Sequence, residues 1–221
     1  MSTIKYKSIL ELNHLEAREF FLKAESYCNV DFPKYINFSH LISKVHKVLD
    51  GKDLTTMRKG TPRDYDDVNY TILNNKDGRY AWRPFQLIHP ALYVSLVHKM
   101  TEEVAWESIR DKFREFSENE KIRCLSLPVK SLSEKTDKEE QVFHWWHEVE
   151  QRSIELSLDY QYMLETDLTD CYSSIYTHSI VWALHSKEIA KEKRTDKALI
   201  GNVIDSHIQD MRHGQTNGIP Q

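Results

Sequence analysis

Glycine and proline are scarce in this chain, and their scarcity limits the folds that are open to it. Only six residues of each type occur among 221. Because glycine and proline are the strongest local breakers of regular structure, their absence from long stretches favours extended helices. Hydrophobic residues make up 40% of the sequence, enough to build a folded core around such helices. The sequence therefore predicts a mostly helical α+β protein with few strands.

Apolar spacing and capping residues predict where the helices lie. Residues 101–116 give the clearest case, because Trp106, Ile109 and Phe113 recur at helical spacing. A capping box at Ser8 and Glu11 predicts the start of a first helix that runs to residue 28. Further helices are expected from Ser39 to a stop at Gly51 and over residues 91–100, 141–158, 174–187 and 196–214.

The predicted strands are fewer and shorter. Two β-prone runs within residues 68–88 flank Asp77-Gly78, a dipeptide suited to a tight turn, and so predict a β-hairpin. Pro84 limits the pairing of its second strand. Residues 122–129 and 160–167 are the other strand candidates.

Charge and cysteine usage narrow the functional classes. The formal net charge of −4 gives no general sign of a nucleic-acid-binding surface, although residues 57–63 are locally basic. No window approaches the roughly 20 apolar residues of a membrane span, and the first residues lack a signal-peptide core, so no membrane partner is expected. The three scattered cysteines favour a reducing, cytoplasmic location.

The stretch from Tyr162 to Ile180, YMLETDLTDCYSSIYTHSI, places two acids three positions apart after an apolar run. If residues 160–167 form a strand, Asp167 lies at its end, beside the backbone carbonyl of Leu168. Oxygen ligands in that arrangement suit a hard cation such as Mg²⁺. The alternative is an ordinary strand-to-helix turn in which Asp170 caps the following helix.

The segment from Asp167 to Ile175 resembles motif A of the reverse transcriptases. Gly218-Ile219-Pro220-Gln221 resembles the start of their motif B, in the same order along the chain. Upstream, NNKDGRYAWRPFQLIHP resembles the fingers hairpin that covers the incoming nucleotide. The run WRPFQLIHPALYVSLV is most similar to the bacterial abortive-infection and defence-associated members of that superfamily.

The resemblance implies a right-hand polymerase with fingers and a partial palm. It implies an N-terminal helical region over residues 1–60, a fingers region over 61–158 and part of a palm over 159–221. Its activity would be RNA-directed DNA synthesis in antiphage defence, with a template-primer and deoxynucleoside triphosphates as partners. The chain could also assemble as a homo-oligomer.

The resemblance also implies a role for each site residue. Asp167 and the Leu168 carbonyl would bind catalytic Mg²⁺ in a two-metal site. Tyr172 would exclude the 2′-hydroxyl of ribonucleotides. The remaining nucleotide-binding residues would be Lys76 and Arg83 on the hairpin, Asp170 as a cap or triphosphate-side organiser, and Pro220 and Gln221 in the nucleotide-pocket loop.

The sequence departs from the family pattern in one respect. It contains no aromatic-x-Asp-Asp motif, which supplies the other metal-binding carboxylates. Asp66 and Asp67 form the only Asp-Asp pair, but Tyr65 is one position too close to them and the pair precedes motif A. We therefore expect a fragment of a longer polymerase, with the remaining metal ligands outside this chain and no deoxynucleotide incorporation by the 221 residues alone.

Two other functions compete with this interpretation. The first is a non-catalytic nucleic-acid-binding or assembly module that retains the fingers, and the second is a helical interaction protein with a chance motif. His144 and His147 share a helical face but have no evident third zinc ligand, and Trp145 and Trp146 between them are expected to pack against the palm. His207 is expected at the surface of the last helix.

Overall fold

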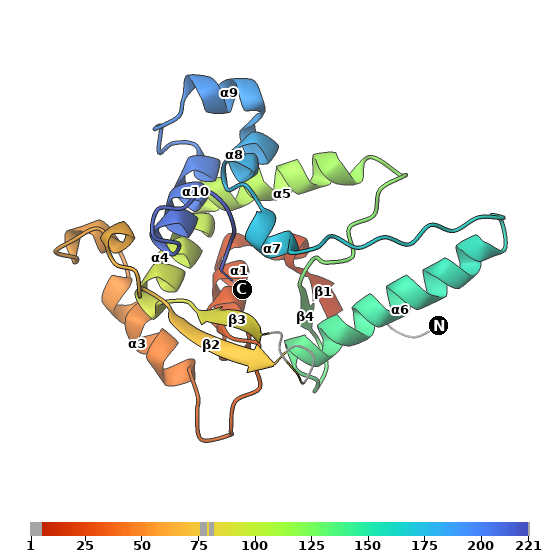
Figure 1. Cartoon of the computed structure of the whole chain (residues 1–221), viewed down its shortest axis with the longest axis horizontal. Helices are drawn as coiled ribbons and strands as arrows, with labels where there is room; N and C mark the ends of the chain where they lie inside the picture. Colours follow the sequence, from red (N-terminus) through yellow and green to blue (C-terminus); the bar gives the residue numbers. More distant parts are fainter. Residues whose placement is uncertain (1–5, 76–78, 80–81, 221) are drawn as a thin grey trace.

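The computed structural model describes residues 6–75, 79 and 82–220. About 51% of the chain is helical, and the described residues form two small antiparallel sheets (Figure 1). The α+β class expected from the sequence is confirmed. In the part of the chain that the structure describes, no helix is both long and apolar enough to cross a membrane.

The N-terminal region is not the single helix that its capping box suggested. It forms β1 (Tyr6–Ser8), a 3-10 turn (Ile9–Glu11), α1 (His14–Phe21) and α2 (Ala24–Tyr27). The predicted capping box at Ser8 is present but caps only the 3-10 turn. Asn13 then caps α1 with a second box, in which its side chain accepts from the backbone N–H groups of Leu15 and Glu16. Two closely spaced caps therefore divide the segment.

The predicted hairpin is present. Strands β2 (Tyr70–Asn75) and β3 (Trp82–Leu87) pair in a continuous antiparallel register in which Pro84 lies opposite Leu73. The expected turn at Asp77-Gly78 and the candidate cation Lys76 lie outside the described residues. The second sheet pairs β1 with β4 (Val129–Ser131), so a strand begins where the predicted strand 122–129 was expected to end.

Three long helices surround the main core. They are α4 (Pro90–Met100), α5 (Glu103–Ser117) and α10 (Ile200–Asp210). Their buried side chains pack with Ile9, Leu12 and others from the N-terminal region. Trp106 lies at the centre, 2% exposed, and its indole N–H donates to the Leu12 carbonyl at 2.9 Å. The core thus joins residues from all three expected regions of the chain.

A smaller core lies around α3 (Ser39–Leu49), which begins at Ser39 as predicted and packs on α4. Gly51 follows this helix with a φ of +65°, the left-handed conformation that glycine adopts without steric cost. Two short 3-10 turns, Leu54–Thr56 and Pro62–Asp64, then lead to the hairpin.

Helix α6 (Asp137–Ser157) extends from the body of the protein (Figure 1). The expected packing of Trp145 and Trp146 against a palm is wrong, since both side chains are about half exposed, at 49% and 48%. Residues 158–170 then return towards the body without regular structure. The helix is held at its first turn, where Asp137 accepts from the Ser131 N–H at 2.8 Å and forms an ion pair with Lys23.

The last part of the chain forms α7 (Cys171–Ser174), α8 (His178–His185) and α9 (Lys187–Glu192) before α10. The helix predicted over residues 174–187 is thus divided, because Ile175 and Tyr176 are extended and Ser186 has a φ of +71°. Helices α8 and α10 approach closely at Gly201. A Cβ on Gly201 would lie 2.9 Å from the Val181 Cα, so a residue without a side chain is needed there.

Candidate functional site

The predicted metal ligand Asp167 lies in the extended segment between α6 and α7 (Figure 1). This segment is not the strand expected over residues 160–167, because no neighbouring strand pairs with it among the described residues. Its side chains are exposed, Leu164 at 91% and Leu168 at 73%. The Asp167 carboxylate accepts a hydrogen bond from the Leu168 N–H at 2.8 Å and otherwise faces solvent. Asp167 and the Leu168 carbonyl therefore occupy a loop rather than the end of a strand.

Asp170 does not cap α7 with its side chain, so the capping expectation is wrong. Its backbone is left-handed, with φ 50° and ψ 42°, a conformation that aspartate tolerates better than most residues. The Asp170 carbonyl accepts from the Ser174 N–H at 3.0 Å and from the Ser173 hydroxyl at 2.9 Å. The backbone of Asp170 turns the chain into α7, and its carboxylate stays exposed.

The two segments that resemble motifs A and B lie side by side. The Ile219 N–H donates to the Tyr172 carbonyl at 3.0 Å, and the Gly218 N–H donates to the Ile175 carbonyl at 2.7 Å. An isolated β-bridge and a further backbone bond extend this contact, between Tyr176 and Asn217 and between Thr177 and Thr216. The Tyr172 side chain remains 55% exposed, although its backbone carbonyl takes part in this contact. Residues distant in sequence thus form one backbone-bonded surface.

Gly218 makes this close approach sterically feasible. It has a φ of +84°, and a Cβ added there would lie 3.0 Å from the Ser173 carbonyl oxygen. Only glycine combines this backbone conformation with such a short distance to another backbone. Pro220 follows, partly buried, and Gln221 lies outside the described residues.

Arg212 connects the hairpin to the same surface. Its guanidinium donates to the Gln86 side chain on β3 and to the Asn217 carbonyl, both at 3.5 Å. Its Nε is buried and has no hydrogen-bond partner within the described residues. Arg83 lies exposed on β3, opposite Asn74 in the hairpin register. Sequence reasoning missed Arg212, because its contact with Gln86 depends on the tertiary structure.

Metal binding at this surface rests on few donors. Among the described residues there is no group of three or more His, Cys, Asp or Glu side chains that could hold a metal ion. Asp167 and Asp170 are the carboxylates nearest in sequence to the Tyr172 contact, and their oxygens suit Mg²⁺. These two carboxylates and the Leu168 carbonyl are fewer donors than a complete Mg²⁺ site needs, and their role in metal binding is a proposal.

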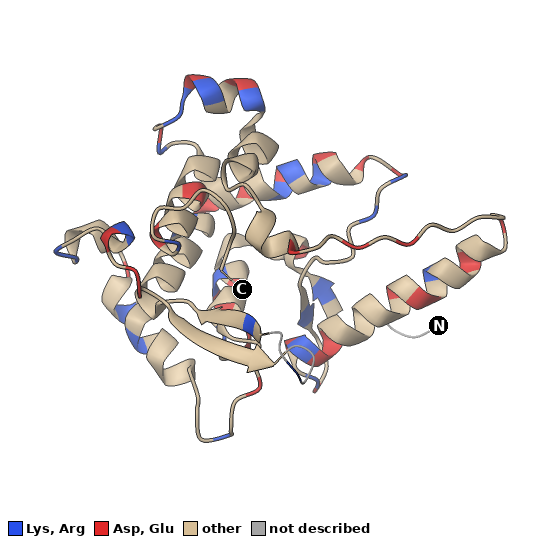
Figure 2. Ribbon diagram, viewed as in Figure 1, with Lys and Arg blue, Asp and Glu red and all other residues tan. Residues whose placement is uncertain are grey.

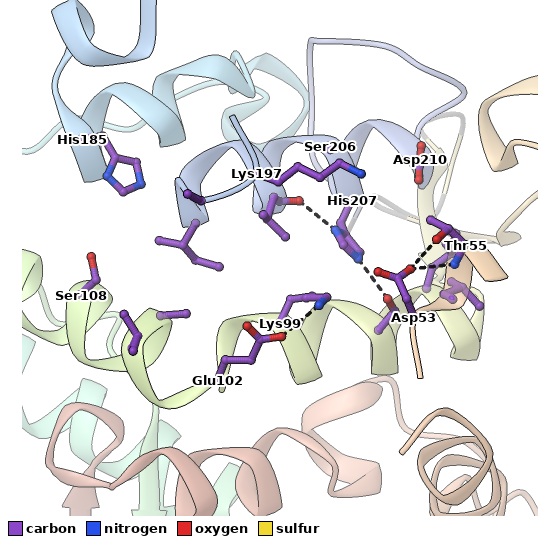
Figure 3. Close-up of a pocket in the computed structure, with 18 of the residues that line it drawn as sticks. Asp53, Thr55, Lys99, Glu102, Ser108, His185, Lys197, Ser206, His207 and Asp210 are labelled. Carbon is purple, nitrogen blue, oxygen red and sulfur yellow. Dashed lines mark hydrogen bonds and ion pairs between the residues drawn. The ribbon is translucent and has the colours of Figure 1, made fainter. Parts of the chain in front are cut away.

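A cavity of about 410 Å³ lies between α10, α4 and residues 53–58 (Figure 3). Here His207, expected at the surface, is partly buried. Its Nδ1–H donates to the Val203 carbonyl at 2.8 Å, which leaves Nε2 to accept from the Ser95 hydroxyl at 3.1 Å. Burial lowers the pKa of His207 and so favours this neutral form. The apolar stripe of Ile204 and Ile208 on α10 could have indicated the burial of its neighbour.

Several charged residues around this cavity form ion pairs. The Lys99 Nζ lies 3.0 Å from the Glu102 Oε1. Arg58 and Arg63 both form ion pairs with Asp210. Hydrogen bonds from the Thr55 backbone and hydroxyl lower the pKa of Asp53. The Ser95–His207 contact joins α4 to α10, and no carboxylate of the described residues contacts His207. We interpret it as a structural contact.

No protein-family model matches the sequence, and no curated protein matches it either. The family resemblance therefore rests on the motifs themselves, and any function drawn from it is a proposal.

Proposed function

We propose that this chain provides the fingers and the first part of the palm of an RNA-directed DNA polymerase. The observation that carries the proposal is the backbone contact between residues 172–177 and residues 216–219. A polymerase that uses motifs A and B needs them side by side, because together they shape the pocket for one incoming nucleotide. Chance similarity of two short sequences carries no requirement that the two segments touch.

The hairpin contact gives further support. Arg212 links Gln86 on β3 to the loop at Asn217, so the hairpin base is hydrogen-bonded to the proposed nucleotide pocket. In the proposal, Arg83 and Lys76 would neutralise the triphosphate of a deoxynucleotide. Positively charged groups at that place stabilise the charge that develops during phosphoryl transfer.

The roles of Asp167 and Tyr172 follow from their chemistry. Asp167, with the Leu168 carbonyl, would provide oxygen ligands for Mg²⁺, which when bound would activate the primer hydroxyl and stabilise the leaving pyrophosphate. Tyr172 would present its ring to the sugar, where bulk excludes a 2′-hydroxyl. Asp170 would hold the turn between them, and Pro220 and Gln221 would form the pocket loop.

The proposal is tested by primer extension with the full-length protein. We expect Asp167→Ala to reduce deoxynucleotide incorporation by a factor of about 1,000 or more, since a metal ligand in the transition state is lost. Glu165→Ala is the matched control, because Glu165 is an exposed acid in the same loop and has no assigned role. Equal activity of the two variants would remove Asp167 from the metal site.

Sugar selection provides a separate test. Tyr172→Ala should increase ribonucleotide incorporation relative to deoxynucleotide incorporation by about tenfold or more, since a steric block worth a few kcal/mol is removed. Tyr162→Ala, which changes a tyrosine that is 91% exposed, should leave the ratio unchanged. An unchanged ratio in both variants would contradict the role of Tyr172.

The same variants test antiphage defence. If DNA synthesis provides resistance, cells that carry the gene should lose protection against phage when Asp167 becomes Ala. A gene product that binds primed template without extending it, and protects with either residue, would instead favour the non-catalytic nucleic-acid-binding module.

A further inference from the structure

A second cavity, of about 310 Å³, lies among α8, α9 and α10 and has no part in the proposed polymerase reaction. Its lining combines a histidine–aspartate pair, two aromatic rings and two cations: His178, Asp205, Tyr176, Trp182, Lys191 and Arg194. We propose that this cavity binds a nucleoside 5′-phosphate, either as a free mononucleotide or as the phosphorylated end of a nucleic-acid strand.

The histidine is fixed by a buried carboxylate. Asp205 is 7% exposed, and its Oδ2 lies 2.7 Å from the His178 Nδ1. Its other oxygen accepts from the Gln209 side-chain amide at 2.8 Å. Because an ionised carboxylate can only accept, Nδ1 carries the proton. The Nε2 of His178, on a side chain that is 38% exposed, remains to hydrogen-bond a ligand.

The cations provide the complementary charge for a phosphate. Lys191 and Arg194 are exposed at the rim, and neither forms an ion pair in the described part of the chain. In Figure 2, basic positions alternate with acidic ones along α9, and basic positions follow in the turn after it. A phosphate held between these two side chains would accept charge-assisted hydrogen bonds, which are roughly twice as strong as neutral ones.

The aromatic residues favour a nucleoside over phosphate alone. The rings of Tyr176 and Trp182 lie 5.6 Å apart at the cavity, tilted by 58°. Tyr176 is 40% exposed, and Trp182 is partly buried with the Lys187 Nζ 5.1 Å from its ring centroid. An aromatic ring that a nucleobase can reach stacks on it regardless of base identity. The Asn202 side-chain amide already donates to the carbonyls of Lys193 and Asp196, both at 2.8 Å, so its oxygen is left to accept from a sugar or base. The cavity volume falls within the range of small-molecule sites.

The cavity differs from the proposed polymerase pocket in its residues. Asp167, Asp170, Tyr172 and Arg83 do not line it. Tyr176 is the connection between the two, since it forms the β-bridge with Asn217 in the loop beside α7. A bound nucleotide would therefore contact a residue that supports that loop.

The test is calorimetric titration of the 221-residue chain in the absence of Mg²⁺ with adenosine 5′-monophosphate, adenosine and inorganic phosphate. We expect the monophosphate to bind more tightly than either part alone. The Lys191→Ala/Arg194→Ala variant should weaken its binding by about tenfold or more, since two charge-assisted contacts are lost. Lys193→Ala is the matched control, because Lys193 is exposed beside them but does not line the cavity.

His178→Asn separates ligand binding from folding. The asparagine amide can still donate to Asp205, but the atom that corresponds to Nε2 is absent, so binding should weaken while the thermal unfolding temperature stays close to wild type. Asp167→Ala should leave monophosphate binding unchanged, which distinguishes this cavity from the polymerase pocket.

Two arms of the experiment distinguish the source of the ligand. Tighter binding of a 5′-phosphorylated oligothymidylate than of the monophosphate assigns the site to strand ends. Binding of the monophosphate alone assigns it to free nucleotides. Failure of both to bind, or equal weakening by Lys193→Ala and by the double variant, would overturn the proposal and leave His178–Asp205 as a contact between helices.

Discussion

Helices α5 and α6 both carry tryptophans, but the surroundings of those residues are opposite. Trp106 on α5 is buried among residues from both ends of the described chain and donates to the Leu12 carbonyl. Trp145 on α6 is 49% exposed. The α5 helix is thus stabilised by tertiary burial. The α6 helix depends on its N-terminal anchor and local contacts, such as the capping box at Thr136 and the Arg152–Glu155 ion pair.

This contrast shows that helix formation and helix burial are separate properties. Both helices satisfy their backbone internally, and both begin after a recognisable polar residue. The apolar stripe of α5 is buried, because α1, α4 and α10 pack about the same core. Helix α6 contacts β4, the Tyr6 ring and Arg123, but much of its apolar surface stays exposed. The outer part of α6 and the segment after it leave Ile154, Leu158 and Leu164 exposed.

The largest expected effect comes from replacing the two tryptophans. Trp106→Ala should lower the free energy of unfolding by about 3–5 kcal/mol, since a large cavity and an unpaired Leu12 carbonyl result. Trp145→Ala should lower it by less than about 1 kcal/mol, because its side chain has few buried contacts to lose. Urea denaturation monitored by circular dichroism measures both. Similar losses of stability would show that Trp145 is packed in solution and would contradict the difference in burial between α5 and α6.

A smaller effect is expected at the contact between α8 and α10. Gly201→Ala should destabilise the protein by about 1–3 kcal/mol, since the new methyl group meets the Val181 backbone and forces the helices apart. Gly60→Ala is the control, because its Cβ would contact only the exposed Tyr65 side chain, which can move. If Gly201→Ala were as stable as Gly60→Ala, the two helices would pack less closely than described.

The smallest effect concerns pH. The Nε2 of His98 on α4 lies 2.7 Å from the Nδ1 of His46 on α3. Burial, together with the nearby His46 and Arg18, lowers the pKa of His98 from 6.5 to about 4. Because the folded pKa is below the unfolded one, the unfolded state takes up more protons as the pH falls. Stability should therefore be full above pH 6.5 and decline towards pH 4, on the order of 1 kcal/mol after allowance for solvent screening.

Thermal unfolding across this pH range tests the effect in wild type and in His98→Gln. The glutamine variant should lose the part of the pH dependence that comes from this site. An identical pH profile for the two proteins would show that His98 titrates normally. Trp145 takes no part in the contact between His46 and His98, so Trp145→Ala should retain the wild-type profile.

Local sequence rules predicted several elements correctly. Ser39 and Gly51 delimit α3, and the two β-prone runs form the β2–β3 hairpin, because caps, glycine and alternation act within a few residues. The same rules failed at residues 8–28, where the second cap at Asn13 was overlooked. They failed again at residues 160–167, because a strand needs a partner and an apolar run does not specify one.

The candidate functional site shows the same difference between features that local sequence predicts and features that depend on tertiary packing. The sequence singled out Asp167, Tyr172 and the Gly218 segment by motif, and their roles remain predictions. It did not indicate Arg212, the buried position of His207 or the His178–Asp205 pair, because each depends on which helices meet.

The sequence by itself determined the α+β class, most of the long helices and the hairpin, since these depend on short-range spacing and backbone preference. Only the tertiary structure decided that residues 172–177 lie against residues 216–219. The physical reason is that residues 172–177 precede α8 and residues 216–219 follow α10, so the packing of α8 on α10 brings the two segments together. That packing needs a glycine at position 201, because a Cβ there would lie 2.9 Å from the Val181 Cα.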